Sequence, residues 1–117
     1  MNDLSKRLLK FAINVITLLR KLPNTLEYKV IKYQLIKAST SSGANYEEAQ
    51  GASSKADFTN KVRISLKEMR ESNFWLKVIE GINDQEKLKN EIESLVMESE
   101  ELKKIFGSIC SKTIRKK

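Results

Sequence analysis

The chain has 117 residues and a formal net charge of +7, with 22 lysines and arginines against 15 aspartates and glutamates. This length suits one domain with one core, and 40% hydrophobic residues exclude a disordered chain. One proline and four glycines leave few places for turns, which argues against a fold of many short β-strands.

The composition also excludes several classes of chemistry. Without histidine there is no Ser-His or Cys-His nucleophile pair and no histidine metal ligand, so we expect no enzymatic activity, no metal and no cofactor. Apolar runs are too short to span a bilayer, and no signal-peptide cleavage site follows Phe11–Leu19. With a single cysteine and no mark of secretion, we expect a cytoplasmic protein without membrane contact.

Helix signals divide the chain into four segments, at about 3–22, 25–50, 56–81 and 84–113. Pro23 ends the first segment, and glycines lie at the ends of the second and third. The connections are short enough to make neighbouring helices antiparallel. We therefore predict an all-α fold, with residues 1–117 forming a single antiparallel up-down-up-down four-helix bundle that ends in a basic tail at 112–117.

The first helix has a wide apolar arc and a basic opposite face. The arc consists of two adjoining seams, Leu4, Leu8, Phe11, Val15, Leu18 and Leu22 beside Leu9, Ala12, Ile16 and Leu19. Together the seams cover about half of the helix, which is more than one core needs. The opposite face carries Lys6, Arg7, Lys10 and Lys21.

The second helix repeats this excess of apolar surface. Leu26, Val30, Tyr33 and Ile36 form a patch apart from its main seam. Extra apolar stripes favour a protein partner, and a second copy of the chain is the simplest one. The alternative is that wide helix faces fill an irregular core.

Polar residues on the second and third helices have two interpretations. The residues are Ser41, Asn45, Glu48, Glu68 and Glu71. They could line a ligand pocket, or they could form an interhelical network that fixes the register of the bundle, because buried polar groups must be paired. We favour the structural network. We expect no di-iron site of the bundle type, because its Glu-x-x-His motifs need histidine. Mg²⁺ or Ca²⁺ held by oxygen ligands alone stays open as an alternative, but no residues single it out.

Basic residues are the candidate binding surface. The residues Lys112, Arg115, Lys116 and Lys117 follow the last acidic residue, Glu101, and the basic face of the first helix lies beside them if the first and last helices pack together. Such a surface suits phosphate-driven, weakly sequence-selective binding of nucleic acid. The alternative is a solvated face with a frayed tail.

Several segments resemble a known family. The stretch Ser41–Ala49 (SSGANYEEA), Asp57-Phe58, Lys67–Glu71 (KEMRE) and Trp75-Leu76 look like the bacterial four-helix-bundle proteins encoded in intervening sequences of the large-subunit ribosomal RNA gene, often labelled ribosomal-protein-like. Ser42 departs from the family pattern, which has an aliphatic residue there.

The resemblance implies a ring-shaped homopentamer. It also extends to the accessory protein of diversity-generating retroelements, a similar basic bundle that binds nucleic acid and a reverse transcriptase. We therefore expect an oligomeric accessory protein that associates with RNA or DNA, and with a reverse transcriptase or another protein as a further candidate partner. A protein–protein interaction scaffold with no nucleic-acid role is the alternative.

Overall fold

The computed structural model describes residues 1–115 of the chain, and their side chains as far as Thr113. Four α-helices account for most of this part: α1 (Asp3–Leu19), α2 (Leu26–Gln50), α3 (Lys55–Ile82) and α4 (Lys89–Arg115), with a short 3₁₀ helix, η1 (Glu86–Leu88), before α4. The described residues contain no strand, so the predicted all-α class is confirmed. Within this part of the chain, no helix is both long enough and apolar enough to cross a bilayer.

Side-chain caps explain where the first three helices begin. Asn2 accepts a hydrogen bond from the backbone N–H of Ser5 at 2.8 Å, and Thr25 and Ser54 cap α2 and α3 in the same way. The predicted ends of two helices differ from the structure. The first stops at Leu19 rather than at residue 22, because the last turn tightens: the N–H groups of Lys21 and Leu22 donate to carbonyls three residues back, at 2.9 and 3.2 Å, instead of four. The fourth begins at Lys89 rather than at residue 84, because η1 comes first.

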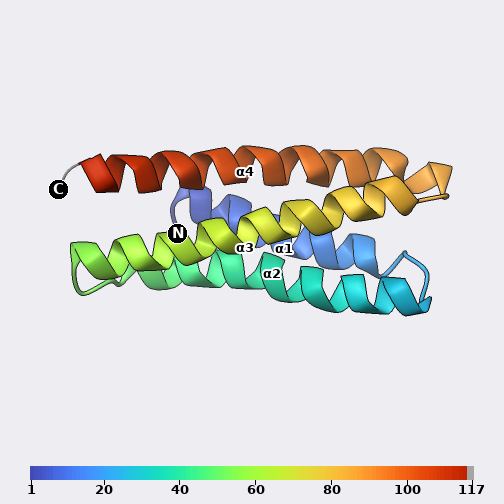
Figure 1. The fold of residues 1–117 in the computed structure, drawn as a ribbon, viewed down its shortest axis with the longest axis horizontal. Coiled ribbons are helices and arrows are strands. Elements are labelled where there is room, and N and C mark those ends of the chain that lie inside the picture. The colour runs from blue at the N-terminus through green and yellow to red at the C-terminus, as the bar shows by residue number, and fades with distance from the viewer. Residues whose placement is uncertain (116–117) are drawn as a thin grey trace.

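The helices lie side by side along a molecule that measures 48 × 23 × 19 Å (Figure 1). Within the described residues α2 packs against α1 and α3, and α4 packs against α3 and, much less extensively, against α1. The α1–α2 and α3–α4 connections lie at one end of the molecule and the α2–α3 connection at the other, and α3 crosses in front of α1 (Figure 1).

The core contains apolar residues of all four helices. Phe11, Met69, Leu76, Leu102 and Phe106 are at most 1% exposed. Their spacing follows the helical repeat, so each helix turns one apolar stripe inward.

One close approach between helices stands out. A Cβ atom added at Gly43, inside α2, would lie 3.4 Å from Cβ of Leu8 on α1. Glycine thus allows α1 and α2 to pack closely at this point.

Candidate nucleic-acid interface

Two of the basic residues predicted to bind nucleic acid pair with carboxylates of α4. Arg7 makes a two-pronged contact with Glu98, from Nη2 to Oε1 at 2.7 Å and from Nε to Oε2 at 3.1 Å. Its hydrogen bond to Glu98 raises the pKa of Arg7. Lys21 Nζ lies 2.8 Å from Oε1 of Glu91. The two ion pairs link the N-terminal part of the chain to α4. Since a carboxylate already balances their charge, Arg7 and Lys21 attract phosphate less than a lone cation does.

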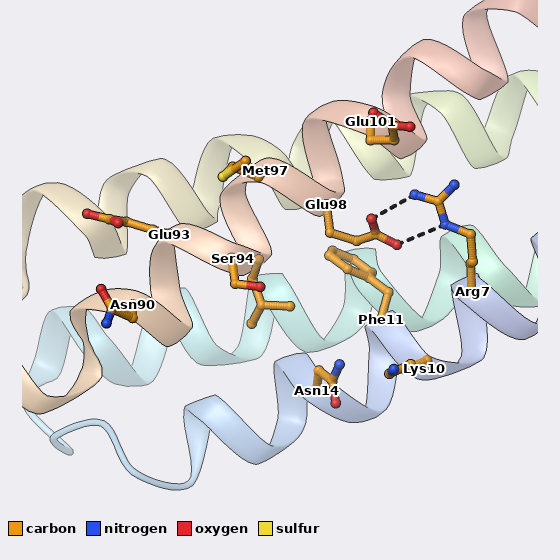
Figure 2. Close-up of a pocket in the computed structure, with 11 residues that line it drawn as sticks. Arg7, Lys10, Phe11, Asn14, Asn90, Glu93, Ser94, Met97, Glu98 and Glu101 are labelled. Atoms are coloured by element: carbon orange, nitrogen blue, oxygen red, sulfur yellow. Dashed lines mark hydrogen bonds and ion pairs between the residues drawn. The ribbon is translucent and has the colours of Figure 1, made fainter.

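Arg7 and Glu98 lie in a groove between α1 and α4 with a volume of about 680 Å³ (Figure 2). Lys10 and Phe11 belong to the α1 wall, and Glu93 and Glu101 belong to the α4 wall with Glu98 (Figure 2). Three carboxylates thus face two cations. This balance disfavours a polyanion inside the groove.

The other predicted cations are distributed over the surface. Lys6, Lys10 and Lys112 are exposed and form no ion pair among the described side chains. Arg115 ends α4, but its side chain lies outside the described part. Lys116 and Lys117 also lie outside the described residues.

The structure does not bring the five residues of the predicted polar network together. Asn45 donates to Ser41 of its own helix, to the carbonyl at 2.9 Å and to Oγ at 3.1 Å. Glu71 accepts from Trp75 Nε1 at 3.2 Å, also within one helix. Glu48 alone of these residues reaches another helix by a bond of its side chain, to Lys61 Nζ at 2.8 Å, within the described part of the chain.

The backbone carbonyl of Glu68, rather than its carboxylate, accepts a hydrogen bond from Ser72 of the same helix at 2.9 Å. The polar residues predicted to fix the bundle register therefore lie mostly along their own helices. Among the described residues, no group of three or more histidine, cysteine, aspartate or glutamate side chains is placed to hold a metal ion.

Buried interhelical hydrogen bonds occur at residues outside the predicted polar network. Ser42 Oγ on α2 donates to the Ser65 carbonyl on α3 at 2.9 Å, and Ser65 Oγ donates to the Ser42 carbonyl at 2.8 Å. Both serines are fully buried. Ser42, which departs from the family pattern, thus has a hydrogen-bonding partner in Ser65. An aliphatic side chain at either position would remove one of the two bonds.

A second polar contact joins α3 to α4. Buried Asn73 donates to Ser99 Oγ at 2.8 Å, and its Oδ1 accepts from Lys103 Nζ at 3.3 Å. Lys103 also pairs with Glu100 at 2.9 Å, and Lys77 contacts the same carboxylate at 3.2 Å. These hydrogen bonds, from Lys103 first and Lys77 second, lower the pKa of Glu100 to about 2.

The analysis of the sequence also missed a row of cations on α3. Arg63, Lys67 and Arg70 are all exposed, and none of them forms an ion pair among the described side chains. Their spacing of four and three residues was the available signal, because it places them on one face of a helix. We call these three residues the α3 basic stripe.

Large apolar side chains remain exposed on the predicted α2 patch. Leu26 is 80% exposed, Tyr33 65% and Val30 51%. Further exposed apolar side chains occur on the other three helices, namely Leu9, Ile13, Ile64, Phe74, Ile82 and Met97. A single copy of the chain therefore leaves the α2 patch exposed, whereas the second seam predicted for the first helix is only partly exposed, with Leu9 in solvent and Leu19 buried in the core.

The geometry defines a class of protein, a basic bundle of four long helices with polar contacts between the helices and a substantial uncovered apolar surface. A family model described as 23S rRNA-intervening sequence protein matches residues 2–108, and the chain belongs to that family.

A crystal structure from Bacteroides thetaiotaomicron, of a protein with unknown function from the S23 ribosomal protein family, is similar with a TM-score of 0.77 and 34% sequence identity. The similarity covers 92% of this chain and 97% of the other. A search of curated proteins found no match. The family predicted from the sequence is thereby confirmed.

Proposed function

We propose that this chain is one up-down-up-down subunit of a ring-shaped homopentamer, and that the ring is a non-enzymatic accessory protein that binds nucleic acid, with RNA as the first candidate. The positions of the connections at the two ends of the molecule support the alternating helix directions (Figure 1). The family description, which names an intervening sequence of 23S rRNA, supports RNA.

Exposed apolar side chains on both flanks of α2 support the assembly. Leu9 and Ile13 lie on α1, whereas Ile64 and Ile82 lie on α3, and both helices pack on α2. In such an assembly, the exposed side chains of α1 in one subunit contact those of α3 in the next. Every subunit can then make this contact twice, once through each face. Such contacts close into a ring when the rotation between subunits permits.

One observation carries the nucleic-acid part of the proposal, namely the surplus of uncompensated positive charge. Five of the 22 lysines and arginines form ion pairs among the described side chains. Exposed Lys6, Lys10 and Lys112 are among those outside such pairs. A ring repeats every cation on each subunit, so weak phosphate contacts act together through their high effective concentration.

Multi-angle light scattering tests the assembly. We expect a single species with five times the mass of the chain at micromolar concentration. A monodisperse monomer would refute the ring, and a dimer would refute the pentamer while still accounting for the apolar surface.

Fluorescence anisotropy tests the binding, with labelled single-stranded RNA and duplex DNA at several salt concentrations. Each phosphate contact should contribute about −0.7 to −0.9 to the log–log slope of affinity against salt. Replacing Lys6 and Lys112 by glutamine should flatten this slope and leave the oligomer unchanged. If neither nucleic acid binds at about 50 mM salt, where phosphate contacts are strongest, the protein is better described as a protein–protein scaffold.

A further inference from the structure

The α3 basic stripe runs straight along the exposed side of α3. Its positions, 63, 67 and 70, span seven residues, which is about 10 Å along the helix axis. Neighbouring cations are thus separated by about one helical turn, a distance comparable to that between successive phosphates of an extended strand. The sequence places these cations beside each other only when it is projected on a helix, because apolar residues, Ser65 and Glu68 separate them in linear order.

Two acidic residues lie next to the stripe in sequence, Glu68 after Lys67 and Glu71 after Arg70, and neither forms an ion pair with it among the described side chains. Glu71, one turn after Lys67, accepts a hydrogen bond from Trp75 Nε1 at 3.2 Å. On α4, Glu100 is held by Lys103 at 2.9 Å and by Lys77 at 3.2 Å. The three cations of the stripe are therefore unpaired among the described side chains, with Glu68 and Glu71 beside them in sequence.

The adjacent part of α4 adds no acid to this surface. α3 packs against α4, whose C-terminal part follows Glu101. That part of α4 carries Lys103, Lys104 and Lys112, and no acidic residue follows Glu101. Lys104 and Lys112 form no ion pair among the described side chains, so this part of α4 adds positive charge.

An exposed aromatic ring continues the stripe. Phe74 lies four residues beyond Arg70 and is 57% exposed. Its ring meets that of Trp75 edge to face, with centroids 5.1 Å apart. Trp75 packs partly against the core, so it holds the Phe74 ring from one side and leaves the rest of it in solvent.

We propose that the face formed by Arg63, Lys67, Arg70 and Phe74 binds single-stranded nucleic acid, the three cations contacting successive phosphates and the phenyl ring stacking on one base. An exposed ring beside a row of cations suits an unpaired strand, whose bases are free to stack on it, better than a duplex, whose bases are stacked on each other. The inference rests on the proposed function and gives it a location away from the acidic α1–α4 groove.

The first test removes the charge of the stripe. The variant carries Arg63→Gln, Lys67→Gln and Arg70→Gln. A matched control carries Arg20→Gln, Lys87→Gln and Lys89→Gln, which removes the same charge from exposed positions near the end of the bundle that holds the α1–α2 and α3–α4 connections (Figure 1). Both variants are compared with the parent by anisotropy, using a labelled single-stranded RNA oligonucleotide and the duplex that it forms with its complement.

We expect the stripe variant to lose at least tenfold in affinity for the single strand at about 50 mM salt, and its log–log salt slope to flatten by about 2, which corresponds to three lost phosphate contacts. The affinity and the salt slope of the control variant should change much less. If both variants weaken binding equally, the stripe has no special role and the inference is wrong, while the proposed function stands. If the parent itself binds no nucleic acid, the proposed function fails first.

The second test separates stacking from charge. Phe74→Leu keeps an apolar side chain and removes the aromatic face, so it should weaken single-strand binding by about fivefold or more without changing the salt slope. The duplex should be much less affected. Unchanged affinity of Phe74→Leu for the single strand would refute the stacking role. A change of oligomeric state in light scattering would also refute it, since Phe74 would then belong to a subunit contact.

A competition experiment compares nucleic acid with an acidic protein as the partner. If poly-glutamate and unlabelled RNA at matched charge inhibited binding of the labelled strand equally, the stripe would be assigned to an acidic protein instead.

Discussion

Replacing Gly43 tests how closely α1 and α2 pack. A helix gains about 1 kcal/mol when an internal glycine becomes alanine. The alanine Cβ would lie 3.4 Å from Cβ of Leu8 and 3.8 Å from its carbonyl oxygen, which is the limit of ordinary contact. We therefore expect Gly43→Ala to stabilise the protein by about 0.5–1 kcal/mol. Gly43→Val adds methyl groups for which there is no room, so it should destabilise by about 1–3 kcal/mol.

Denaturant unfolding at one fixed protein concentration measures these changes in the free energy of unfolding. Gly107→Ala is the control, because a Cβ atom there meets nothing within 4 Å and the full gain of about 1 kcal/mol should appear. If Gly43→Val were as stable as Gly43→Ala, the two helices could not be as close as the structure has them, and the reasoning would be refuted.

Three further predictions concern polar groups. Asn73→Ala removes the 2.8 Å bond to Ser99 and the 3.3 Å bond from Lys103, and should lower the free energy of unfolding by about 1–3 kcal/mol in denaturant melts. Because the folded pKa of Glu100 is depressed to about 2, its contribution to stability is present above the ordinary carboxyl pKa and is lost as pH falls from there toward 2. Glu100→Gln should therefore weaken the dependence of stability on acid pH, and an unchanged pH profile would contradict the assignment. Ser5 Oγ is buried and has no hydrogen-bond partner among the described residues, so Ser5→Ala should be neutral or stabilising in thermal melts, whereas a clear loss would indicate a partner in a neighbouring subunit.

The helices and the core were predictable because their signals are local. Asn2, Thr25 and Ser54 form their caps with backbone groups three residues away, so no other part of the chain is needed. The apolar seams depend only on the repeat of the helix. The late start of α4 was not predicted, because the 3₁₀ geometry of Glu86–Leu88 has no distinct sequence signature.

The polar contacts between helices were harder to predict, because they depend on small rotations of each helix about its axis. Ser41 and Ser42 are adjacent in sequence, but their side chains point about 100° apart. The structure turns Ser42 toward Ser65 and leaves Ser41 to bond with Asn45 in its own helix. Arg7 carries no sign in the sequence that Glu98, on a distant helix, neutralises it.

The packing of α1 has a consequence for the way the chain folds. Helices that pack on their neighbours in sequence make local contacts, and chains rich in local contacts fold fast. The contact of α1 with α4 is the exception, since it joins the two ends of the chain and includes the ion pairs Arg7–Glu98 and Lys21–Glu91. On a ribosome, α1, α2 and α3 can associate while α4 is still being synthesised, so the charged seam between α1 and α4 closes last.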